Sequence, residues 1–221
     1  MATRTRPRAA LPAQPAGDGY HHGALREALL TAGEALLAER GAAGFTLREC
    51  ARRAGVSHAA PAHHFGDVRG LLTALAARGF DRMADLMLRY RDAAPAVPEA
   101  RLVAVGRAYI DFALDHRAHF LLMFGADRLD RTDAELQRCG DRSAAALQQA
   151  MAEVMAARAL PPASLPQRLL LAWSAVHGFA MLVIEGQCQD FFGIGAGQPR
   201  RARAAADAVL ALLQGALAAP G

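Results

Sequence analysis

Apolar residues recur along this chain at the three- and four-residue intervals that place them on one face of a helix. Leu25, Leu29, Ala32 and Leu36 form the first such stripe, and Gly41 stands where a glycine would end the helix. The pattern therefore predicts a first helix that ends near Gly41.

Two shorter helices are predicted next, separated by a glycine. The segment Thr46–Glu49 has the form of a capping box, in which the threonine hydroxyl and the glutamate carboxylate each accept a hydrogen bond from the other residue's backbone. Gly55 then allows a tight turn, and Ser57 can cap a third helix over residues 58–64. Pro61 would be the fourth residue of that helix, where it removes only the first intrahelical hydrogen bond. Two short helices joined by a glycine turn are typical of a helix-turn-helix.

A long fourth helix is predicted from its capping residue Asp67 to Arg91, and Pro95 and Pro98 mark the boundary beyond it. Further helical stripes cover residues 102–116, 120–124, 136–154, 165–185 and 200–218. The pattern predicts an all-α protein of about nine helices, without strands that alternate with helices. We expect a disordered basic arm at residues 1–19, a three-helix helix-turn-helix domain at 20–66 and a larger helical domain at 67–221.

Composition supports helices and an N-terminal basic module. Hydrophobic residues make up 53% of the chain but aromatic residues only 6%, so the apolar content is mostly alanine and leucine, which favour helices over strands. Residues 1–91 hold 13 arginines against 8 acidic residues, whereas residues 92–221 hold 12 against 13. A basic segment joined to a near-neutral one fits a nucleic-acid-binding module on a neutral partner domain.

The cysteines and the longest apolar run indicate the cellular compartment in which the protein is expected. Cys50, Cys139 and Cys188 show no paired spacing, and the start of the chain has no apolar signal segment. We therefore expect reduced thiols and a cytoplasmic protein. The apolar run at residues 169–184 is shorter than the roughly 20 residues that a membrane span needs, so it is predicted to be a helix buried on most sides.

Residues 23–72 resemble the DNA-binding domain of the TetR family of transcriptional regulators. The resemblance rests on Thr46–Ala51, Ala54–Ser57, His64-Phe65 and Leu71-Leu72. The second half resembles the TetR subgroup with a Trp-His-Gly ligand domain, through Tyr109–Ala113, Leu122–Phe124 and Trp173–Gly178. The resemblance implies a homodimeric repressor that binds a near-palindromic DNA operator and is released by a small apolar or aromatic effector.

The resemblance also implies which residues meet DNA. Sequence-specific base contacts are expected from the third helix, through Ser57, His58, Ala59, Ala60 and His63. Phosphate contacts are expected from Thr46, Arg48, His64 and Arg69. The arginines of the N-terminal arm, Arg4, Arg6 and Arg8, either follow the minor groove or belong to a disordered tail.

Two positions depart from the family pattern. The family usually has a tyrosine ahead of the His-Phe pair and a lysine at the start of the fourth helix, and each holds a phosphate; this chain has Ala62 and Val68 there. Arg69, or the arginines at positions 48, 52 and 53, could supply the missing charge.

The expected ligand pocket has apolar walls and one polar group. Its candidate residues are Tyr109, Phe112, Phe120, Met123, Phe124, Trp173 and His177. About half of this set is expected to be core packing, since apolar residues at helical spacing usually are. His177 either orients a ligand's carbonyl or carboxylate or is a satisfied buried histidine. No metal site is predicted, because residues 115–119 offer metal-binding side chains without a third ligand, and no cofactor is expected.

Two alternatives compete with a repressor. A small helical enzyme has little support, since no serine stands in a G-x-S-x-G motif and no carboxylate pair forms a recognisable motif. A ligand-binding relic that lost DNA binding fits Ala62 and Val68. The dimer interface is expected to comprise the apolar helix at residues 165–185 and the last helix.

Overall fold

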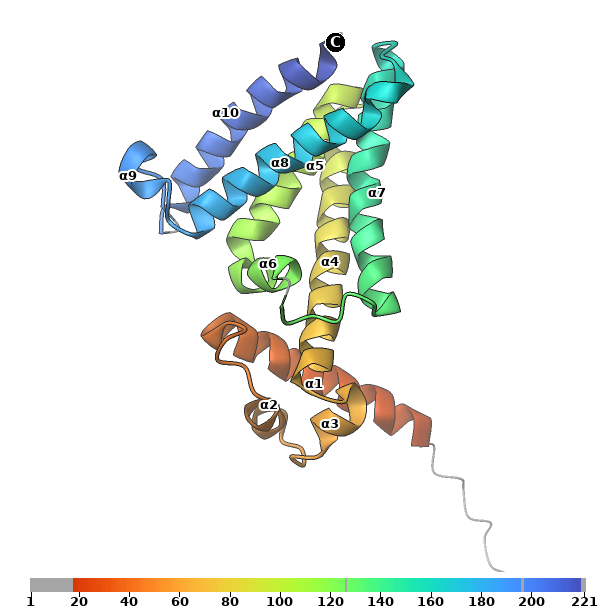
Figure 1. Ribbon diagram of the computed structural model, residues 1–221, viewed down its shortest axis with the longest axis vertical. Coiled ribbons are helices and arrows are strands. Elements are labelled where there is room, and N and C mark those ends of the chain that lie inside the picture. Colours follow the sequence, from red (N-terminus) through yellow and green to blue (C-terminus); the bar gives the residue numbers. More distant parts are fainter. Residues whose placement is uncertain (1–17, 126, 196, 220–221) are drawn as a thin grey trace, which may run out of the picture.

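Helices account for all the regular structure in residues 18–125, 127–195 and 197–219, which are the residues that the computed structural model describes (Figure 1). In chain order they are α1 (Asp18–Arg40), α2 (Leu47–Ala54), α3 (Ala60–Phe65), α4 (Val68–Ala93), α5 (Pro98–Asp115), α6 (Arg117–Phe124), α7 (Ala134–Ala157), the short 3-10 turn η1 (Pro162–Ser164), α8 (Leu165–Ile184), α9 (Gln189–Phe192) and α10 (Pro199–Ala218). The predicted all-α fold is confirmed, and the short α9 is the helix that the sequence pattern did not indicate. The predicted arm falls outside the described residues, apart from its last two positions, which already belong to α1.

Local capping chemistry sets the helix ends near the N-terminus. The Thr46 side chain accepts a hydrogen bond from the backbone N of Glu49 at 3.2 Å, and Asp67 accepts one from the backbone N of Gly70 at 2.9 Å. Gly55 ends α2 with a φ of +68°, a left-handed conformation that favours glycine. The capping box is only half formed, because the carboxylate of Glu49 accepts hydrogen bonds from the guanidinium of Arg52 and from that of Arg53.

The third helix begins later than predicted. It starts at Ala60, and Ala59 rather than Ser57 occupies the N-cap, without a side-chain hydrogen bond. The carbonyl of Ser57 accepts a bond from the backbone N of Ala60 at 3.1 Å. A helix starting at position 58 would need an N–H from Pro61 to close its first turn, and proline has none. The observed start places Pro61 in the first turn of α3, where no such bond is required.

A single hydrophobic core continues from the helix-turn-helix into the larger domain. Helix α4 runs through both parts: it packs against α1 and α3 near its beginning and against α5, α6 and α7 farther along (Figure 1). Gly79 permits the close approach of α6, because a side-chain carbon at this position would lie 2.6 Å from the sulfur of Met123. The core therefore joins the two parts through α4 and α6.

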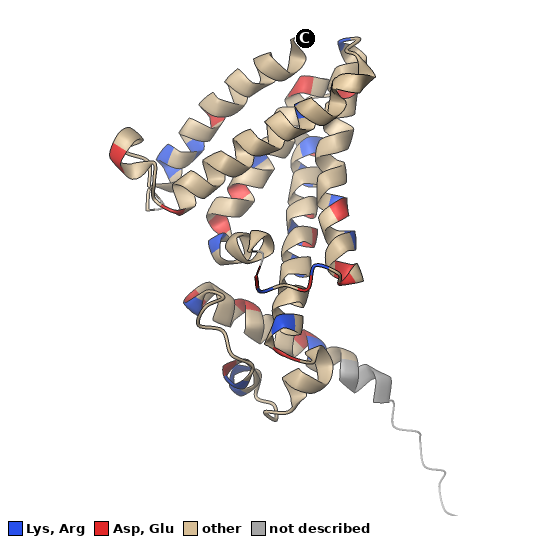
Figure 2. Cartoon of the chain, viewed as in Figure 1, with Lys and Arg blue, Asp and Glu red and all other residues tan. Residues whose placement is uncertain are grey.

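Helix α8 is buried on one face only within a single chain. Its buried residues include Ala172, Val176 and Ala180, whereas Leu171 and Leu182 on the other face are exposed. This differs from the prediction of a helix buried on most sides, because α5, α7 and α10 all pack against the same face. Figure 2 shows α8 as an almost uncharged stretch, and together with η1 it is long and apolar enough, by length and composition alone, to cross a membrane.

A network of charged side chains fastens α10 to α5. The carboxylate of Asp111, which is only 6% exposed, accepts hydrogen bonds from Arg107 of its own helix at 3.1 Å and from Arg203 of α10 at 2.9 Å. The hydroxyl of Tyr90 on α4 donates to the same carboxylate at 3.2 Å. One buried carboxylate thus links three helices.

We predict that replacing Asp111 by alanine lowers the free energy of unfolding by about 2 kcal/mol, because two arginines and a tyrosine lose their shared acceptor. The matched control is Asp115→Ala, which removes an exposed partner of Arg203 and should cost less than about 0.5 kcal/mol. Urea unfolding followed by circular dichroism measures both. Equal costs would show that the buried carboxylate does not carry the network.

Candidate DNA-binding surface and ligand cavity

The residues predicted to contact DNA lie together at one end of the molecule, on α2, α3, the turn between them and the first turn of α4 (Figure 1). Most of them are exposed: Thr46, Arg48, Ser57, His58, Ala59, His63 and Arg69. Ala60 and His64 are half-buried. A surface of exposed small and basic side chains around a short exposed helix is the arrangement that entry into a DNA groove requires.

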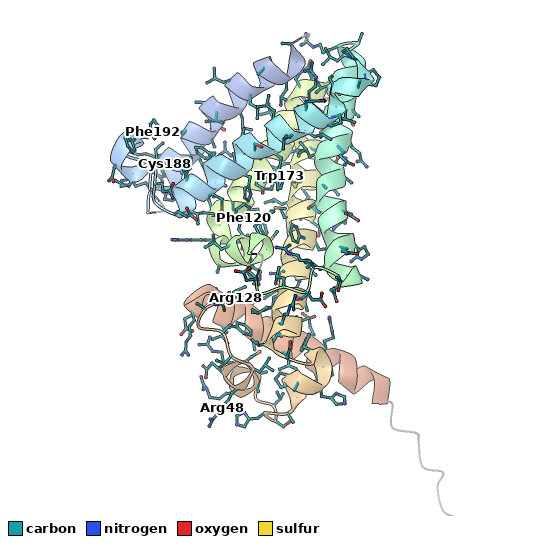
Figure 3. All side chains as sticks on the ribbon, in the orientation of Figure 1. Arg48, Phe120, Arg128, Trp173, Cys188 and Phe192 are labelled. Atoms are coloured by element: carbon teal, nitrogen blue, oxygen red, sulfur yellow. The ribbon has the colours of Figure 1, made fainter. Side chains whose placement is uncertain are left out.

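The arginines of α2 differ in how they are engaged. Arg52 and Arg53 both pair with Glu49, and Arg53 also pairs with Glu39 of α1. These hydrogen bonds hold the pKa of the Glu49 carboxyl at about 2, so the pairs stay ionised at neutral pH. Arg48 has no hydrogen bond or ion pair to any of the described residues, and it points away from the molecule (Figure 3). Arg48 is therefore the arginine of α2 that is free to meet a phosphate.

Arg69 makes a contact within the protein that the sequence did not indicate. Its guanidinium donates a hydrogen bond to the main-chain carbonyl of Leu129, in the loop between α6 and α7, at 2.7 Å. Thr73 on the next turn of α4 accepts a hydrogen bond from the backbone N of Asp130 at 2.9 Å. From the same loop, Arg128 donates to the carbonyl of Ala42, after α1, at 2.6 Å. The α6–α7 loop is therefore tied both to the beginning of α4 and to the segment that follows α1.

An apolar cavity of about 430 Å³ lies in the larger domain, between α4, α5, α7, α8 and α10, with the end of α6 at one side. Its walls include Phe80, Met83, Met87, Leu102, Val103, Val105, Gly106, Tyr109, Phe124, Gly140, Ser143, Ala144, Leu147, Gln148, Leu169, Leu170, Ala172, Trp173, Val176, Leu210, Leu213, Gln214 and Leu217. A concave, mostly apolar site with a few polar groups is the usual form of a small-molecule pocket.

Hydrogen-bonding side chains meet at one side of this cavity. The hydroxyl of Tyr109 lies 2.8 Å from Nδ1 of His177, and Nε1 of Trp173 donates to the same hydroxyl at 3.4 Å. Burial raises the pKa of the Tyr109 phenol and lowers the pKa of the His177 imidazole. Both groups are therefore uncharged at neutral pH. Phe120 and Phe124 pack around them, with ring centres 5.5 Å and 4.6 Å from that of His177.

The residues predicted for the ligand pocket divide into two groups. Tyr109, Phe124 and Trp173 line the cavity. The other four, which the structure also describes, are not among the lining residues: Phe112, Phe120, Met123 and His177. Phe112 stacks on His116 with ring centres 4.9 Å apart, and Met123 faces Gly79. Which residues of the set contact a ligand stays a prediction.

Sequence reasoning missed the walls that α4, α7 and α10 contribute. Met83, Leu147 and Leu213 line the cavity from these helices. Their apolar spacing was visible in the sequence, but the same spacing marks ordinary core residues. Within the described residues, no group of three or more His, Cys, Asp or Glu side chains is placed to hold a metal ion.

Two family models match the chain in the regions just described. Residues 29–75 match the model of the bacterial regulatory proteins of the tetR family, and residues 102–196 match a tetracyclin repressor-like C-terminal domain. The first match covers the helix-turn-helix, and the second contains most of the cavity wall. No curated protein matches the chain.

Solved structures share the whole architecture. A protein of unknown function from Rhodococcus sp. RHA1 is 32% identical with a TM-score of 0.72, and the alignment covers 91% of this chain and 97% of that one. A TetR-family transcriptional regulator from Pectobacterium atrosepticum is 20% identical with a TM-score of 0.66 over 89% and 95% of the two chains. The TetR family transcriptional regulator PfmR from Thermus thermophilus is 17% identical with a TM-score of 0.62 over 84% and 96%.

The family models, found in order on one chain, agree with the helix-turn-helix, the long connecting helix and the helical domain that encloses a cavity. They also place the chain among regulators of transcription and not among enzymes. The chain belongs to the TetR family of bacterial transcriptional regulators.

Proposed function

We propose that this protein is a ligand-responsive repressor, which binds a near-palindromic operator as a homodimer in the cytoplasm and is released by a small apolar or aromatic effector. One observation carries the proposal: α4 begins beside α3 on the candidate DNA-binding surface and farther along provides the cavity wall at Phe80, Met83 and Met87. A molecule in the cavity therefore touches the same rigid element that positions the recognition helix.

The exposed apolar faces of α8 and α10 support a homodimer. Residues 169–184 of α8 and residues 208–218 of α10 contain no Asp, Glu or Arg. Leu171 is 47% exposed, Leu182 is 43% exposed and Leu212 of α10 is 79% exposed. Uncharged helix faces of this length favour contact with a second copy of the chain, which would bring two recognition helices to the two halves of an operator.

Release follows from the geometry of two matched half-sites. An effector that enters behind α4 shifts this helix and the attached α6–α7 loop, and the separation of the two recognition helices changes. The effector must bind the released form better than the DNA-bound form, and a difference in binding free energy of about 1–3 kcal/mol is typical of such coupling.

In the proposed complex with DNA, the phosphate contacts come from Thr46, Arg48, His64 and Arg69. The base contacts come from Ser57, His58, Ala59, Ala60 and His63.

A ligand-binding relic is the second candidate, and Ala62 and Val68 favour it. Both side chains are exposed on the DNA-binding surface, and neither can hold a phosphate. The repressor and the relic would share the same division into a helix-turn-helix domain at residues 20–66 and a larger helical domain at residues 67–221. A gel shift with the DNA upstream of the gene separates them, because the relic should give no specific complex.

We predict that the protein sediments as a dimer and that Leu171→Glu combined with Leu182→Glu makes it a monomer at micromolar concentration. Each buried glutamate would face an apolar surface without a partner. The control is Val97→Glu, which adds one glutamate at an exposed apolar position ahead of α5. The monomeric variant should lose operator binding; a variant that stays dimeric would place the interface elsewhere.

We predict that Arg48→Ala weakens binding to operator and to random DNA alike and lowers the slope of log affinity against log salt by about one phosphate contact. His58→Ala should instead change which sequences are preferred, since this residue is assigned to the bases. Arg89→Ala on the exposed side of α4 is the matched control. Fluorescence anisotropy over a salt series measures all three, and a change of sequence preference in Arg48→Ala would contradict the assignment.

We predict that Ala62→Tyr combined with Val68→Lys tightens binding to operator and to random DNA together, because both side chains reach phosphates and neither reads a base. The salt slope should steepen by about one contact. Val97→Lys adds the same charge away from the surface and should change neither quantity. Unchanged affinity at low salt would mean that the two missing anchors do not limit binding.

A further inference from the structure

We propose that the cavity selects an uncharged, mostly apolar molecule with a single hydrogen-bonding group, which is placed against the hydroxyl of Tyr109, and that it rejects the carboxylate form of the same skeleton. The proposal rests on the proposed function, in which this cavity holds the effector. It goes further by assigning the chemical class of the ligand and the residue that forms a hydrogen bond with the ligand's polar group.

The wall of the cavity offers no counter-ion for a charged ligand. Among the lining residues that the structure describes, polar side-chain atoms come only from Tyr109, Ser143, Gln148, Trp173 and Gln214, and none of these side chains is charged. An ionised carboxylate moved from water into such a place loses its hydration without gaining a partner. The wall therefore favours neutral ligands.

Three arginines on α5 and α7 already have carboxylate partners. Arg107 on α5 pairs with Asp111, and Arg101 on the same helix pairs with Glu153 of α7. Arg142 of α7 pairs with Asp81 of α4. Each of these three cations would have to leave its carboxylate to turn inward to a ligand. Arg168 of α8 instead donates to the main-chain carbonyls of Leu217 and Ala219.

The hydroxyl of Tyr109 retains one unused hydrogen-bonding position. The indole N–H of Trp173 donates to this oxygen at 3.4 Å, and Nδ1 of His177 lies 2.8 Å away. If the phenol donates to His177, its oxygen can still accept a bond from a ligand hydroxyl or amide. If His177 carries its proton on Nδ1 and donates, the phenol O–H is free to donate to a ligand carbonyl. Either arrangement serves one neutral polar group.

The dimensions of the cavity limit the rest of the molecule. Along α5 the lining runs from Leu102 to Tyr109, which is about 10 Å at the rise of a helix. Most of the remaining wall consists of apolar side chains, including Met87, Leu147 and Leu217. A medium-length alkyl chain or a pair of fused rings with one polar end fits this space, and the polar end lies at Tyr109.

The test compares decanol, methyl decanoate and decanoate as probes of the full chain at neutral pH, without DNA. Trp173 is the only tryptophan of the sequence and lines the cavity, so its fluorescence reports binding. We expect decanol and methyl decanoate to bind at least about tenfold more tightly than decanoate. Decanoate binding as tightly as decanol, or no response to any of the three, would overturn the proposal.

Two variants test the residue assignment. Tyr109→Phe should weaken decanol about threefold to tenfold and leave naphthalene, which forms no hydrogen bond, within about twofold. Tyr90→Phe removes a hydroxyl that donates to Asp111 outside the cavity and serves as the matched control. An equal loss for decanol and naphthalene in Tyr109→Phe would show a packing defect and would overturn the role of the hydroxyl.

A third variant adds the missing cation. Gln148→Lys at the exposed rim of the cavity should raise decanoate affinity about fivefold, whereas Gln137→Lys, on the same helix but outside the lining, should not. These titrations are independent of DNA binding. If the protein prefers neutral ligands but forms no operator complex, the inference about the cavity stands and the repressor function is wrong. If it forms an operator complex but shows no preference for neutral ligands, the repressor function stands and the inference about the cavity is wrong.

Discussion

The burial of α4 along its length is the constraint on which the rest of this molecule depends. The helix has 26 residues, about 39 Å at the usual helical rise. Leu71 and Leu75 near its start are fully buried in the core of the helix-turn-helix, and Met83 and Met87 lie in the wall of the cavity. Packed interiors are dense and do not deform continuously. In the proposed mechanism, a displacement at the cavity would therefore move α4 as a rigid body, and α3 would move with it.

The contacts beside α4 at the junction are of a different kind. Hydrogen bonds from Arg69 and Arg128 to main-chain carbonyls hold the α6–α7 loop, and exposed ion pairs between α1 and α4 add to them. His119 of α6 lies buried at this junction, and burial lowers its pKa to about 4, so it carries no charge there. Exchange of such bonds with water costs little compared with opening an apolar core. The junction can therefore rearrange while each domain stays folded.

The sequence predicted those features that local chemistry decides. Thr46, Gly55 and Asp67 are capping and turn residues, and the structure uses each of them as expected. Local reasoning failed at α3, because the serine signal at position 57 competed with the missing N–H of Pro61. It failed more broadly at the cavity, since an apolar side chain at helical spacing can face either a neighbour or a gap. Which of the two occurs depends on how far apart the helices pack, and the sequence of a single helix does not determine that distance.

If the protein is the proposed repressor, the distribution of charge on the candidate DNA-binding surface links its affinity for DNA to its release. Glu49 neutralises much of the charge of Arg52 and Arg53, and Ala62 and Val68 hold no phosphate, so few groups attract DNA at each half-site. A repressor with weakly held half-sites must engage both at once, because two linked contacts bind far more tightly than either alone. The correct spacing of the recognition helices then carries most of the affinity. In the proposed mechanism, a small movement of α4 that changes this spacing would be sufficient for release, and a neutral ligand in the cavity would cause that movement.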